Sequence, residues 1–403
     1  MDILKDKKVL LGVTGGIAAY KACELARLFR KAGAQVRAVM TPAACEFVTP
    51  LTLSALTGHE TALEMFGSSG NIDHIELARW ADLLVIAPAT ANTLAKIAHG
   101  IADNLLTSIA LATTSPKLVA PAMNCAMYAN QATGENLRIL EARGVHIVGP
   151  DTGYQACGET GAGRMSEPDA IFRRAAEILL VPQQSHRMVV TAGPTEEMID
   201  PVRCITNLSS GRMGYALAQA AAIMGWKVTL ISGPVAIPEP VAVEVVRVRT
   251  AAEMMDAAWS AAKSAECFIG CAAVSDYRPQ TVAPQKIKKS SGENLKLVLT
   301  ENPDIVRTVA ALDDLFTVGF AAETDNVLAY AREKLKSKGL DMIVANDVSG
   351  SETGFNSTDN AATVIVADGS EVAFDRMSKE LLAQEIISII NGRIGASGSE
   401  EGI

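Results

Sequence analysis

Cys157 is the residue of the first half whose type and surroundings best suit chemistry. It lies in the segment Ala-Cys-Gly-Glu (residues 156–159), and further glycines stand within six residues on either side. A thiol on a flexible glycine-rich loop can approach a bound molecule and deliver a proton to it. We therefore expect Cys157 to act as an acid on a mobile loop, since a buried structural thiol would be unusual in such a segment.

Other candidate residues of the first half stand where apolar runs end. Residues 88–92 (Pro-Ala-Thr-Ala-Asn) and 121–124 (Pro-Ala-Met-Asn) each follow such a run, and polar side chains at strand ends line the ligand sites of α/β sheets. Residues 12–16 (Gly-Val-Thr-Gly-Gly) suit a phosphate group, although a tight turn explains these glycines equally well. His74 is a candidate base by its type, but a lone histidine is more often a solvated residue at a helix start.

The second half has its own phosphate-site candidates. Residues 191–195 (Thr-Ala-Gly-Pro-Thr) follow an apolar run, and residues 209–214 (Ser-Ser-Gly-Arg-Met-Gly) precede a helical pattern. An ordinary N-cap explains one of the two serines, but not both serines together with two glycines. Asn207 stands just before this segment and can donate a neutral hydrogen bond to an acyl oxygen. We therefore predict that this helix N-terminus binds phosphate groups.

Lysines could complete this second site. Lys286 begins the segment Lys-Ile-Lys-Lys. A run of lysines most often lies on a solvated surface, but its charge could also neutralise a leaving pyrophosphate. Lys334 and Lys338 are four residues apart, so on a helix they lie on the same side. They could add two positive charges to the phosphate site that Lys286 would form. The chain contains no G-x-x-x-x-G-K-[ST] segment, which argues against a P-loop NTPase.

Composition excludes several classes of protein. The 403 residues are 49% hydrophobic, which allows large buried cores in two or three domains and excludes a disordered chain. The formal net charge is −9 and aromatic residues make up 4%, so we expect no nucleic-acid partner and no membrane partner. Seven scattered cysteines form no CxxC pair, and the first residues do not resemble a signal peptide. These features indicate a cytoplasmic protein whose cysteines are reduced.

The hydrophobic pattern predicts an α/β protein with two doubly wound, Rossmann-like domains. In the first half, continuous apolar runs alternate with amphipathic helices, as in parallel sheets that are covered on both faces. The predicted strands are residues 9–13, 35–40, 83–88, 118–120 and 145–148, and the helices are 17–31, 93–98, 136–143 and 170–180. In the second half we predict strands at residues 188–191, 227–231, 268–274, 317–321 and 342–345, a hairpin at 362–374, and helices at 213–224 and 378–390.

These patterns define the predicted domain boundaries. Residues 1–181 form the first domain, residues 182–187 a polar, proline-marked linker, and residues 188–391 the second domain. A long polar loop is expected between the first strand of the second domain and Asn207. We expect the Gly- and Ser-rich tail, residues 392–403, to be disordered.

Five motifs give the first half a specific resemblance. In chain order they are Gly-Gly-Ile-Ala-Ala-Tyr-Lys, Asp-His-Ile-Glu-Leu, Pro-Ala-Thr-Ala-Asn, Pro-Ala-Met-Asn and Ala-Cys-Gly-Glu. Together they resemble the flavin-containing cysteine decarboxylases, in particular the phosphopantothenoylcysteine decarboxylases. The resemblance implies a flavodoxin-like fold with FMN as the cofactor, bound by Gly15, Gly16, Thr41 and Thr90. It also implies that His74 is the base, that Asn124 and Met123 hold the substrate, and that Cys157 is the acid.

The chemistry of this resemblance is self-consistent. A cysteine carboxylate does not lose CO2 directly, because the resulting carbanion has no electron sink. Oxidation of the thiol to a thioaldehyde on a flavin creates that sink, and decarboxylation then gives an enethiol. Reduced flavin and a proton from Cys157 then convert the enethiol into the saturated thiol of the product. A nicotinamide-type Rossmann enzyme would instead need a G-x-G-x-x-G segment and an acidic residue ~20 positions further on.

The second half resembles the phosphopantothenate–cysteine ligases. The motifs are Ala-Gly-Pro-Thr, Ile-Asp-Pro-Val-Arg, Ile-Thr-Asn-Leu-Ser-Ser-Gly-Arg-Met-Gly, Ala-Ala-Val-Ser-Asp-Tyr, Lys-Ile-Lys-Lys, Asn-Pro-Asp-Ile and Gly-Phe-Ala-Ala-Glu-Thr. Over residues 1 to 391 the chain is therefore similar to the bacterial bifunctional proteins of coenzyme A biosynthesis. In that family the ligase uses CTP with Mg2+ to join 4'-phosphopantothenate to cysteine through an acyl-cytidylate.

This resemblance also assigns residues and assembly. It implies that Arg203 and Asn207 hold phosphopantothenate and the acyl-nucleotide, and that Lys286 is catalytic as well as nucleotide-binding. The other residues implied to contact the nucleotide are Ala272, Ala273, Asp276, Asn302, Pro303, Asp304, Ile305, Phe320, Lys334 and Lys338. No metal ligands follow from it. Related decarboxylases form trimers with flavin between subunits and the ligases form dimers, so a homo-oligomer, a dodecamer, is the expectation.

Two alternatives remain for the first half at this point. One is a protein similar to the flavin prenyltransferases, and the other is a regulatory flavoprotein that keeps the fold without turnover. Both share the flavin site, but the Ala-Cys-Gly segment around Cys157 and the complete set of ligase motifs argue against them. CTP-over-ATP selectivity does not follow from the residues.

Overall fold

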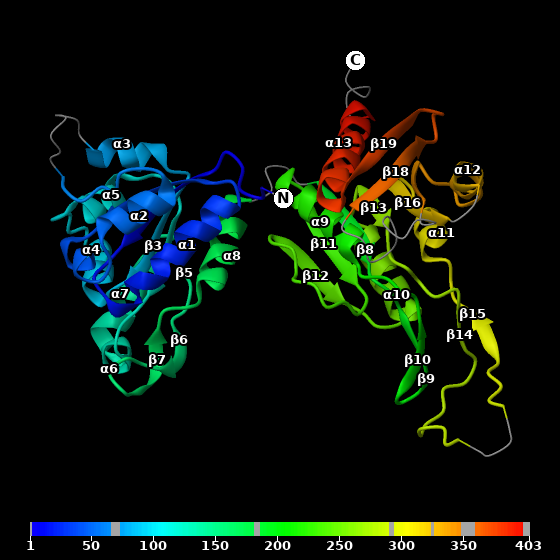
Figure 1. Cartoon of the computed structure of the whole chain (residues 1–403), viewed down its shortest axis with the longest axis horizontal. Coiled ribbons are helices and arrows are strands. Elements are labelled where there is room, and N and C mark those ends of the chain that lie inside the picture. The colour runs from blue at the N-terminus through cyan, green and yellow to red at the C-terminus, as the bar shows by residue number, and fades with distance from the viewer. Residues whose placement is uncertain are drawn as a thin grey trace. The chain divides into compact units, whose positions relative to one another are not determined.

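The computed structural model describes residues 2–65, 73–180, 186–289, 294–323, 326–347 and 359–397. The chain divides into two compact units, Met1–Val181 and Pro182–Ile403. Each unit is an α/β structure with its own largely parallel sheet and helices on both faces, as the sequence predicts (Figure 1). Within the described ranges, none of the helices has the length and apolar character needed to cross a membrane.

The first unit contains a five-stranded parallel sheet in the order β2-β1-β3-β4-β5. This is the order of the flavodoxin-like doubly wound fold, in which ligands bind beyond the carboxyl ends of the strands. All seven residues of β3 are buried, which is why this strand is a continuous apolar run in the sequence. The bounds are β1 Lys8–Val13, β2 Gln35–Met40, β3 Leu83–Ala89, β4 Lys117–Pro121 and β5 His146–Ile147.

Helices cover both faces of this sheet. Phe29 of one helix packs against Phe172 of another, with 5.5 Å between the ring centroids. The helices are η1 Ile17–Ala19, α1 Tyr20–Lys31, η2 Pro42–Glu46, α2 Pro50–Thr57, α3 Asp73–Trp80, α4 Ala91–His99, α5 Leu105–Ala112, α6 Cys125–Ala129, α7 Gln131–Ala142 and α8 Pro168–Leu179. The glycine-rich segment around Cys157 is the turn of a short antiparallel hairpin, β6 Asp151–Tyr154 and β7 Thr160–Arg164.

The second unit has an eight-stranded sheet in the order β12-β11-β8-β13-β16-β17-β18-β19. The first six strands are parallel, and the last two are added antiparallel as the predicted hairpin. The strands are β8 Arg187–Ala192, β11 Lys227–Ser232, β12 Val243–Arg247, β13 Cys267–Gly270, β16 Phe316–Glu323, β17 Met342–Asp347, β18 Asp359–Val366 and β19 Glu371–Ser378. The helices are α9 Arg212–Ile223, α10 Ala251–Ala262, α11 Ile305–Val309, α12 Val327–Ser337 and α13 Lys379–Ser397.

The predicted polar loop before Asn207 is in fact partly strand. It forms the hairpin β9 Glu196–Asp200 and β10 Arg203–Thr206, beside which lies a second ribbon, β14 Tyr277–Pro279 and β15 Leu299–Glu301. Figure 1 shows these strands in an arm that projects from the main sheet. The prediction failed because the two buried carboxylates of the hairpin are satisfied by distant backbone. Glu197 accepts from Ala251 N, and Asp200 from the backbone N–H groups of residues 202, 203 and 287.

Several other boundaries differ from the sequence prediction, among them the start of α7, which lies at Gln131 rather than at residue 136, and two further differences concern the second unit. The predicted strand 268–274 ends at Gly270, and the residues that follow line a cavity instead. Residues 392–397, expected in a disordered tail, continue helix α13, because Ile394 packs against the core and Arg393 pairs with Asp368. Residues 398–403 lie outside the described residues, as do residues 182–185 of the predicted linker, and Arg187 already belongs to β8.

Candidate functional site

A cavity of about 890 Å³ lies at the carboxyl ends of the strands of the first unit. The loops after β1, β2, β3 and β4 and the turn of the β6–β7 hairpin all contribute to its wall. It is lined by seven of the eight site residues that the sequence predicts for this half: Gly15, Gly16, Thr41, Thr90, Met123, Asn124 and Cys157.

One end of this cavity suits an anionic group. Gly15 must be a glycine, because a Cβ atom there would lie 2.4 Å from the Cβ of Ala43. Among the described residues, the buried hydroxyl of Thr41 finds no hydrogen-bond partner, and a bound ligand is one way to satisfy such a group. Thr14 accepts from the Thr90 backbone N–H at 3.0 Å and donates to the Pro88 carbonyl, which joins the ends of β1 and β3. The residues present therefore fit the phosphate of a flavin nucleotide.

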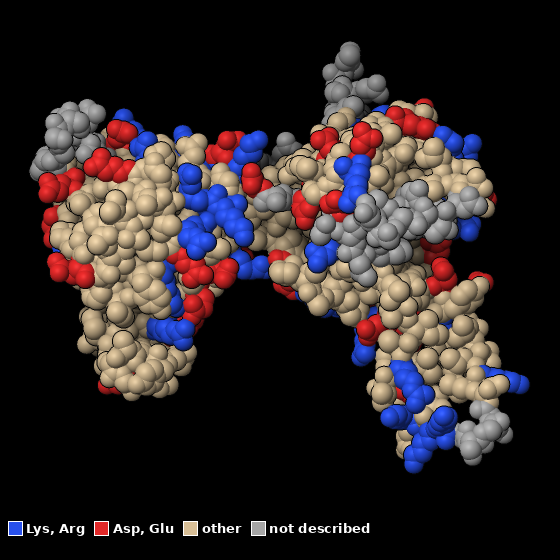
Figure 2. Space-filling view, in the orientation of Figure 1, with Lys and Arg blue, Asp and Glu red and all other residues tan. Residues whose placement is uncertain are grey.

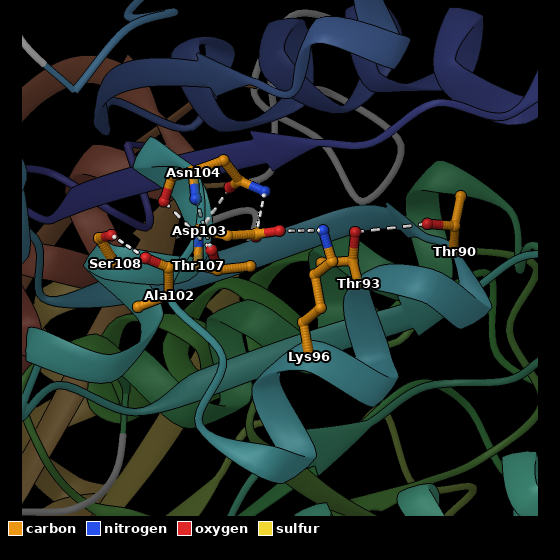
Figure 3. A network of polar contacts seen from close by, with 8 residues as sticks. All are labelled: Thr90, Thr93, Lys96, Ala102, Asp103, Asn104, Thr107 and Ser108. Atoms are coloured by element: carbon orange, nitrogen blue, oxygen red, sulfur yellow. Dashed lines mark hydrogen bonds and ion pairs between the residues drawn. The ribbon is translucent and has the colours of Figure 1, made fainter.

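A polar network forms another wall of the same cavity, and Figure 3 shows it from close by. The Lys96 ammonium lies 2.6 Å from the Asp103 carboxylate, and this contact holds the pKa of Asp103 below its usual range. The hydroxyl of Thr90 donates to that of Thr93 at 3.3 Å. Asn104 is the N-cap residue of α5 and belongs to the same network. The side chains of this wall are therefore held in place before any ligand arrives.

Asn124 and Cys157 meet on the wall of the same cavity. The Asn124 side-chain oxygen accepts from the Ala126 backbone N–H at 2.8 Å and caps α6. This cap directs the amide nitrogen toward Cys157, with 3.3 Å between Nδ2 and Sγ. The Cys157 side chain is exposed rather than buried in a core. An amide and an accessible thiol thus lie together beside the cavity.

The structure does not bring His74 to this cavity of its own chain. His74 lies near the start of α3 and is not among the lining residues. Its Nδ1 atom is buried and has no hydrogen-bond partner in the part of the chain that the structure describes. The imidazole is thus separate from the Asn124–Cys157 pair within one described chain.

A second cavity, of about 710 Å³, opens at the strand ends of the second unit. The N-terminus of α9 and the loops after β13 and β15 form most of its wall. Eleven of the thirteen site residues that the sequence predicts for this half line it: Asn207, Ala272, Ala273, Asp276, Asn302, Pro303, Asp304, Ile305, Phe320, Lys334 and Lys338.

The N-terminus of α9 provides this cavity with backbone donors. Gly211 is the N-cap residue and has a φ of 72°, a conformation that favours glycine. Ser209, Ser210 and Gly211 all line the cavity in front of the 12-residue helix. The N–H groups of a helix's first turn have no carbonyl partner within the helix, and together with the helix dipole they favour an anion at this point.

Two predicted residues of the second cavity are tied to the protein by hydrogen bonds. Asn207 donates its amide hydrogens to the carbonyls of Ala273 and Val274 at 3.1 and 3.0 Å. The predicted donation to an acyl oxygen therefore requires one of these bonds to be released. The Lys338 ammonium lies 2.9 Å from the Asp304 carboxylate. Burial opposes ionisation of Asp304, but the Arg307 backbone N–H and then Lys338 bring its pKa below the usual value.

Comparisons with known proteins decide the family. The "Flavoprotein" family description matches residues 2–179, and "DNA/pantothenate metabolism flavoprotein C-terminal domain" matches residues 183–393. The coenzyme A biosynthesis bifunctional protein CoaBC of Vibrio vulnificus is 49% identical over 98% of this chain and 100% of its own length. The chain belongs to the bifunctional coenzyme A biosynthesis proteins. It therefore combines a flavoprotein phosphopantothenoylcysteine decarboxylase domain with a phosphopantothenate–cysteine ligase domain.

Two further relatives are similar. The CoaBC protein of Escherichia coli is 49% identical, covering 96% of this chain and 97% of its own length. Among solved structures, the FMN binding protein AtHal3 is 39% identical over 45% of this chain and all of its own, with a TM-score of 0.39. The regulatory flavoprotein and the prenyltransferase-like protein are set aside, since full-length identity covers both domains of the bifunctional family.

The ligase cavity also contains residues that the motif analysis did not single out. The buried Ser275 hydroxyl and the Asn346 side-chain oxygen have no hydrogen-bond partner among the described residues, and both residues line the cavity. Lys379 lines it as well, and burial, followed by the Arg212 charge, lowers its pKa. Asn346 directly follows the apolar run of residues 342–345 within β17, so the strand-end rule could have found it. Lys379 begins α13, and no local signal connects it to the cavity.

Arg203 and Lys286, which the sequence also assigns to the ligase site, do not line the cavity. Both lie in the arm. Arg203 donates to the Ile287 carbonyl at 3.0 Å, so the arginine and the lysine segment lie together. Figure 2 shows a gathering of basic side chains at the end of this arm. The described residues contain no group of three or more His, Cys, Asp or Glu side chains that could hold a metal ion.

Proposed function

We propose that the ligase domain activates 4'-phosphopantothenate with CTP, forms an acyl-cytidylate, and transfers the acyl group to the amine of cysteine. The decarboxylase domain, with FMN, then converts the product to 4'-phosphopantetheine. The observation that carries this proposal is the 3.3 Å contact between Asn124 and Cys157 on a cavity that Thr41 also lines, whose hydroxyl finds no partner among the described residues. Together they provide an anion site, a substrate holder and a proton donor around one space.

In the decarboxylase domain, Gly15, Gly16 and Thr41 would bind the cofactor phosphate, and Thr90 would lie near the flavin. FMN would supply the oxidation of the substrate thiol and the later return of the electrons. His74 would remove a proton at the start, and Asn124 with Met123 would hold the substrate. Cys157 would give its proton to the carbon of the enethiol as the reduced product forms.

In the ligase domain, the backbone at the α9 N-terminus and Lys334 would hold the triphosphate, which Mg2+ would accompany. Asn207 and Arg203 would hold the phosphopantothenate end. Lys286 would neutralise charge on the leaving pyrophosphate. Asp276 would complete the contacts to the nucleotide.

We also propose that the enzyme is a homo-oligomer, a cytoplasmic dodecamer, in which copies complete one another's sites. The same observation supports this in both domains. His74 is absent from the decarboxylase cavity of its own chain, and Arg203 and Lys286 are absent from the ligase cavity of theirs. Neighbouring copies could supply all three side chains.

Cofactor content tests the assignment of the decarboxylase domain. Protein purified without added cofactor is expected to be yellow and to release one FMN per chain on denaturation. Thr41→Val, which removes the unpartnered hydroxyl while keeping its shape, is expected to weaken FMN binding by about tenfold. A colourless protein that FMN does not reconstitute would contradict the assignment.

A further inference from the structure

Residues 271–276, which we call the wall loop, all line the ligase cavity, although they follow strand β13 directly. The apolar run in the sequence predicts that this strand continues to residue 274, but its pairing with β8 and β16 ends at Gly270. Beyond that point the backbone N–H groups of the wall loop need other partners, because a donor that is shielded from water is costly to leave unsatisfied. These partners determine the shape of the cavity wall.

Two threonine hydroxyls provide partners for the wall loop. Thr191 Oγ1 accepts from the Cys271 and Ala272 backbone N–H groups at 3.2 and 3.3 Å. Thr195 Oγ1 accepts from the Ser275 N–H group at 3.0 Å. Thr191 belongs to β8 and Thr195 lies just beyond that strand, and the two residues are only 3% and 0% exposed. Three hydrogen bonds from the wall loop therefore end on two buried hydroxyls.

Further hydrogen bonds complete this support. The Ala273 N–H group donates to the Gly193 carbonyl at 2.9 Å, so residues 191–195 bind the backbone of residues 271, 272, 273 and 275. The Asn207 amide donates to the Ala273 carbonyl at 3.1 Å, and the Asn302 amide donates to the Ser275 carbonyl at 2.8 Å. The wall loop is thus held in a defined conformation by neighbouring segments on both its N–H and its carbonyl groups.

We propose that Thr191 and Thr195 are positioning residues of the ligase site, which hold the wall loop in the conformation that receives the nucleotide. The sequence places both threonines in a phosphate-site candidate, but neither is among the described residues that line the cavity. This inference rests on the proposed function, in which Ala272, Ala273 and Asp276 of the wall loop contact the nucleotide. A wall that is ordered before binding does not have to be ordered by the ligand, so the nucleotide binds more tightly.

The test compares Thr191→Val with Thr191→Ser in the full-length protein. Valine keeps the shape of threonine and removes the hydroxyl, whereas serine keeps the hydroxyl. The first readout is hydrogen exchange of the wall-loop amides in nucleotide-free protein, measured by mass spectrometry of the peptides that cover them. The second is KM for CTP and kcat of pyrophosphate release with 4'-phosphopantothenate. The first readout needs no nucleotide, so it reports on the wall loop even if the proposed activity fails.

For Thr191→Val we expect the Cys271 and Ala272 amides to exchange about tenfold faster, because they lose their acceptor. KM for CTP should rise about tenfold while kcat changes less than about twofold, since the nucleotide must now order the wall loop itself. A general loss of folded protein would instead lower kcat and leave KM unchanged. Thr191→Ser should keep slow exchange and a KM close to that of the wild type.

A second variant and a matched control complete the experiment. Thr195→Val should accelerate exchange at Ser275 and also raise KM for CTP, and it carries the test if Thr191→Val does not fold, since Thr195 accepts from only one of these N–H groups. Thr317→Val is the control. Thr317 is 1% exposed in β16, and its hydroxyl donates to the Asp341 carboxylate at 3.0 Å rather than to the wall loop. This variant should match the wild type in exchange of the wall loop and in KM.

Three results would overturn the proposal. In the first, removal of the Thr191 hydroxyl leaves exchange of the wall loop unchanged. In the second, exchange becomes faster while KM for CTP stays at the wild-type value, so the conformation of the wall loop does not matter for the nucleotide. In the third, Thr191→Ser or Thr317→Val raises KM as much as Thr191→Val does. Absence of CTP-dependent pyrophosphate release in the wild type would instead count against the proposed function, and the exchange comparison would still decide whether the threonines hold the wall loop.

Discussion

At the scale of single residues, the decarboxylase site depends on contacts between side chains that are far apart in the sequence. Asn124 and Cys157 are 33 positions apart, and they meet because the Asn124 oxygen is used to cap α6. The cap leaves only the amide nitrogen for the thiol. A substitution at either position therefore changes chemistry without removing a core side chain.

Cys157→Ser and His74→Asn are expected to fail at different steps. A serine hydroxyl is close in shape to the thiol but is far less acidic, since an unperturbed thiol has a pKa of about 8.5. Cys157→Ser should bind FMN and release CO2, but stall with reduced flavin and an oxidised enethiol product. His74→Asn should fail before any flavin reduction, because the base is needed at the start.

Anaerobic mixing of each variant with phosphopantothenoylcysteine distinguishes these outcomes, with flavin bleaching and product mass as the readouts. If Cys157→Ser still delivers fully reduced phosphopantetheine at the wild-type rate, the proton-donor role is wrong. Cys157 would then be an ordinary exposed thiol of the β6–β7 turn.

At the scale of elements, the arm carries ligase residues away from the ligase cavity. The buried Asp200 carboxylate accepts from the Ile287 backbone N–H at 3.1 Å, and Arg203 donates to the Ile287 carbonyl. The hairpin β9–β10 therefore anchors the segment that carries Lys286. This anchor makes the arm a unit that can present both basic residues together.

Lys286→Gln is expected to abolish ligation while leaving decarboxylation of supplied intermediate unchanged. The substitution removes an exposed charge, so no core packing is lost. Each half-reaction is measured separately, with pyrophosphate release for the ligase and CO2 release for the decarboxylase. A similar loss in both activities would contradict the account, because it would indicate misfolding or one shared site.

The sequence predicts the sheets better than the arm, for a physical reason. Strands such as β3 are buried on both faces, so their apolar runs are visible without knowledge of the rest of the fold. The polar residues that follow these strands then indicate where the cavities lie. The hairpin β9–β10 is polar, and it forms because distant backbone groups satisfy Glu197 and Asp200. No local pattern in the sequence reports such partners.

At the scale of the whole molecule, each domain keeps a cavity at the carboxyl edge of its own sheet. The two activities thus have separate sites, and each site lacks residues that the family motifs assign to it. The proposed completion by a second copy would account for both cases, and it would make assembly a condition of activity.

Mixed oligomers test this completion. Chains with His74→Asn and chains with Cys157→Ser are each expected to form no reduced product. If His74 serves the cavity of a neighbouring copy, oligomers assembled from equal amounts of the two should recover about a quarter of the wild-type sites. Separately tagged chains, co-expressed and purified through both tags, provide the sample. Recovery no greater than the sum of the separate variants would show that His74 acts elsewhere.

The most direct test of the central claim follows the carboxyl carbon of cysteine through both domains. Purified full-length protein is supplied with 4'-phosphopantothenate, CTP, Mg2+ and cysteine labelled at that carbon. The account predicts that labelled CO2 and 4'-phosphopantetheine form in equal amounts, and that neither forms when CTP is left out. Release of CO2 without CTP, or ligation product that accumulates in the FMN-loaded protein with no CO2 released, would contradict it.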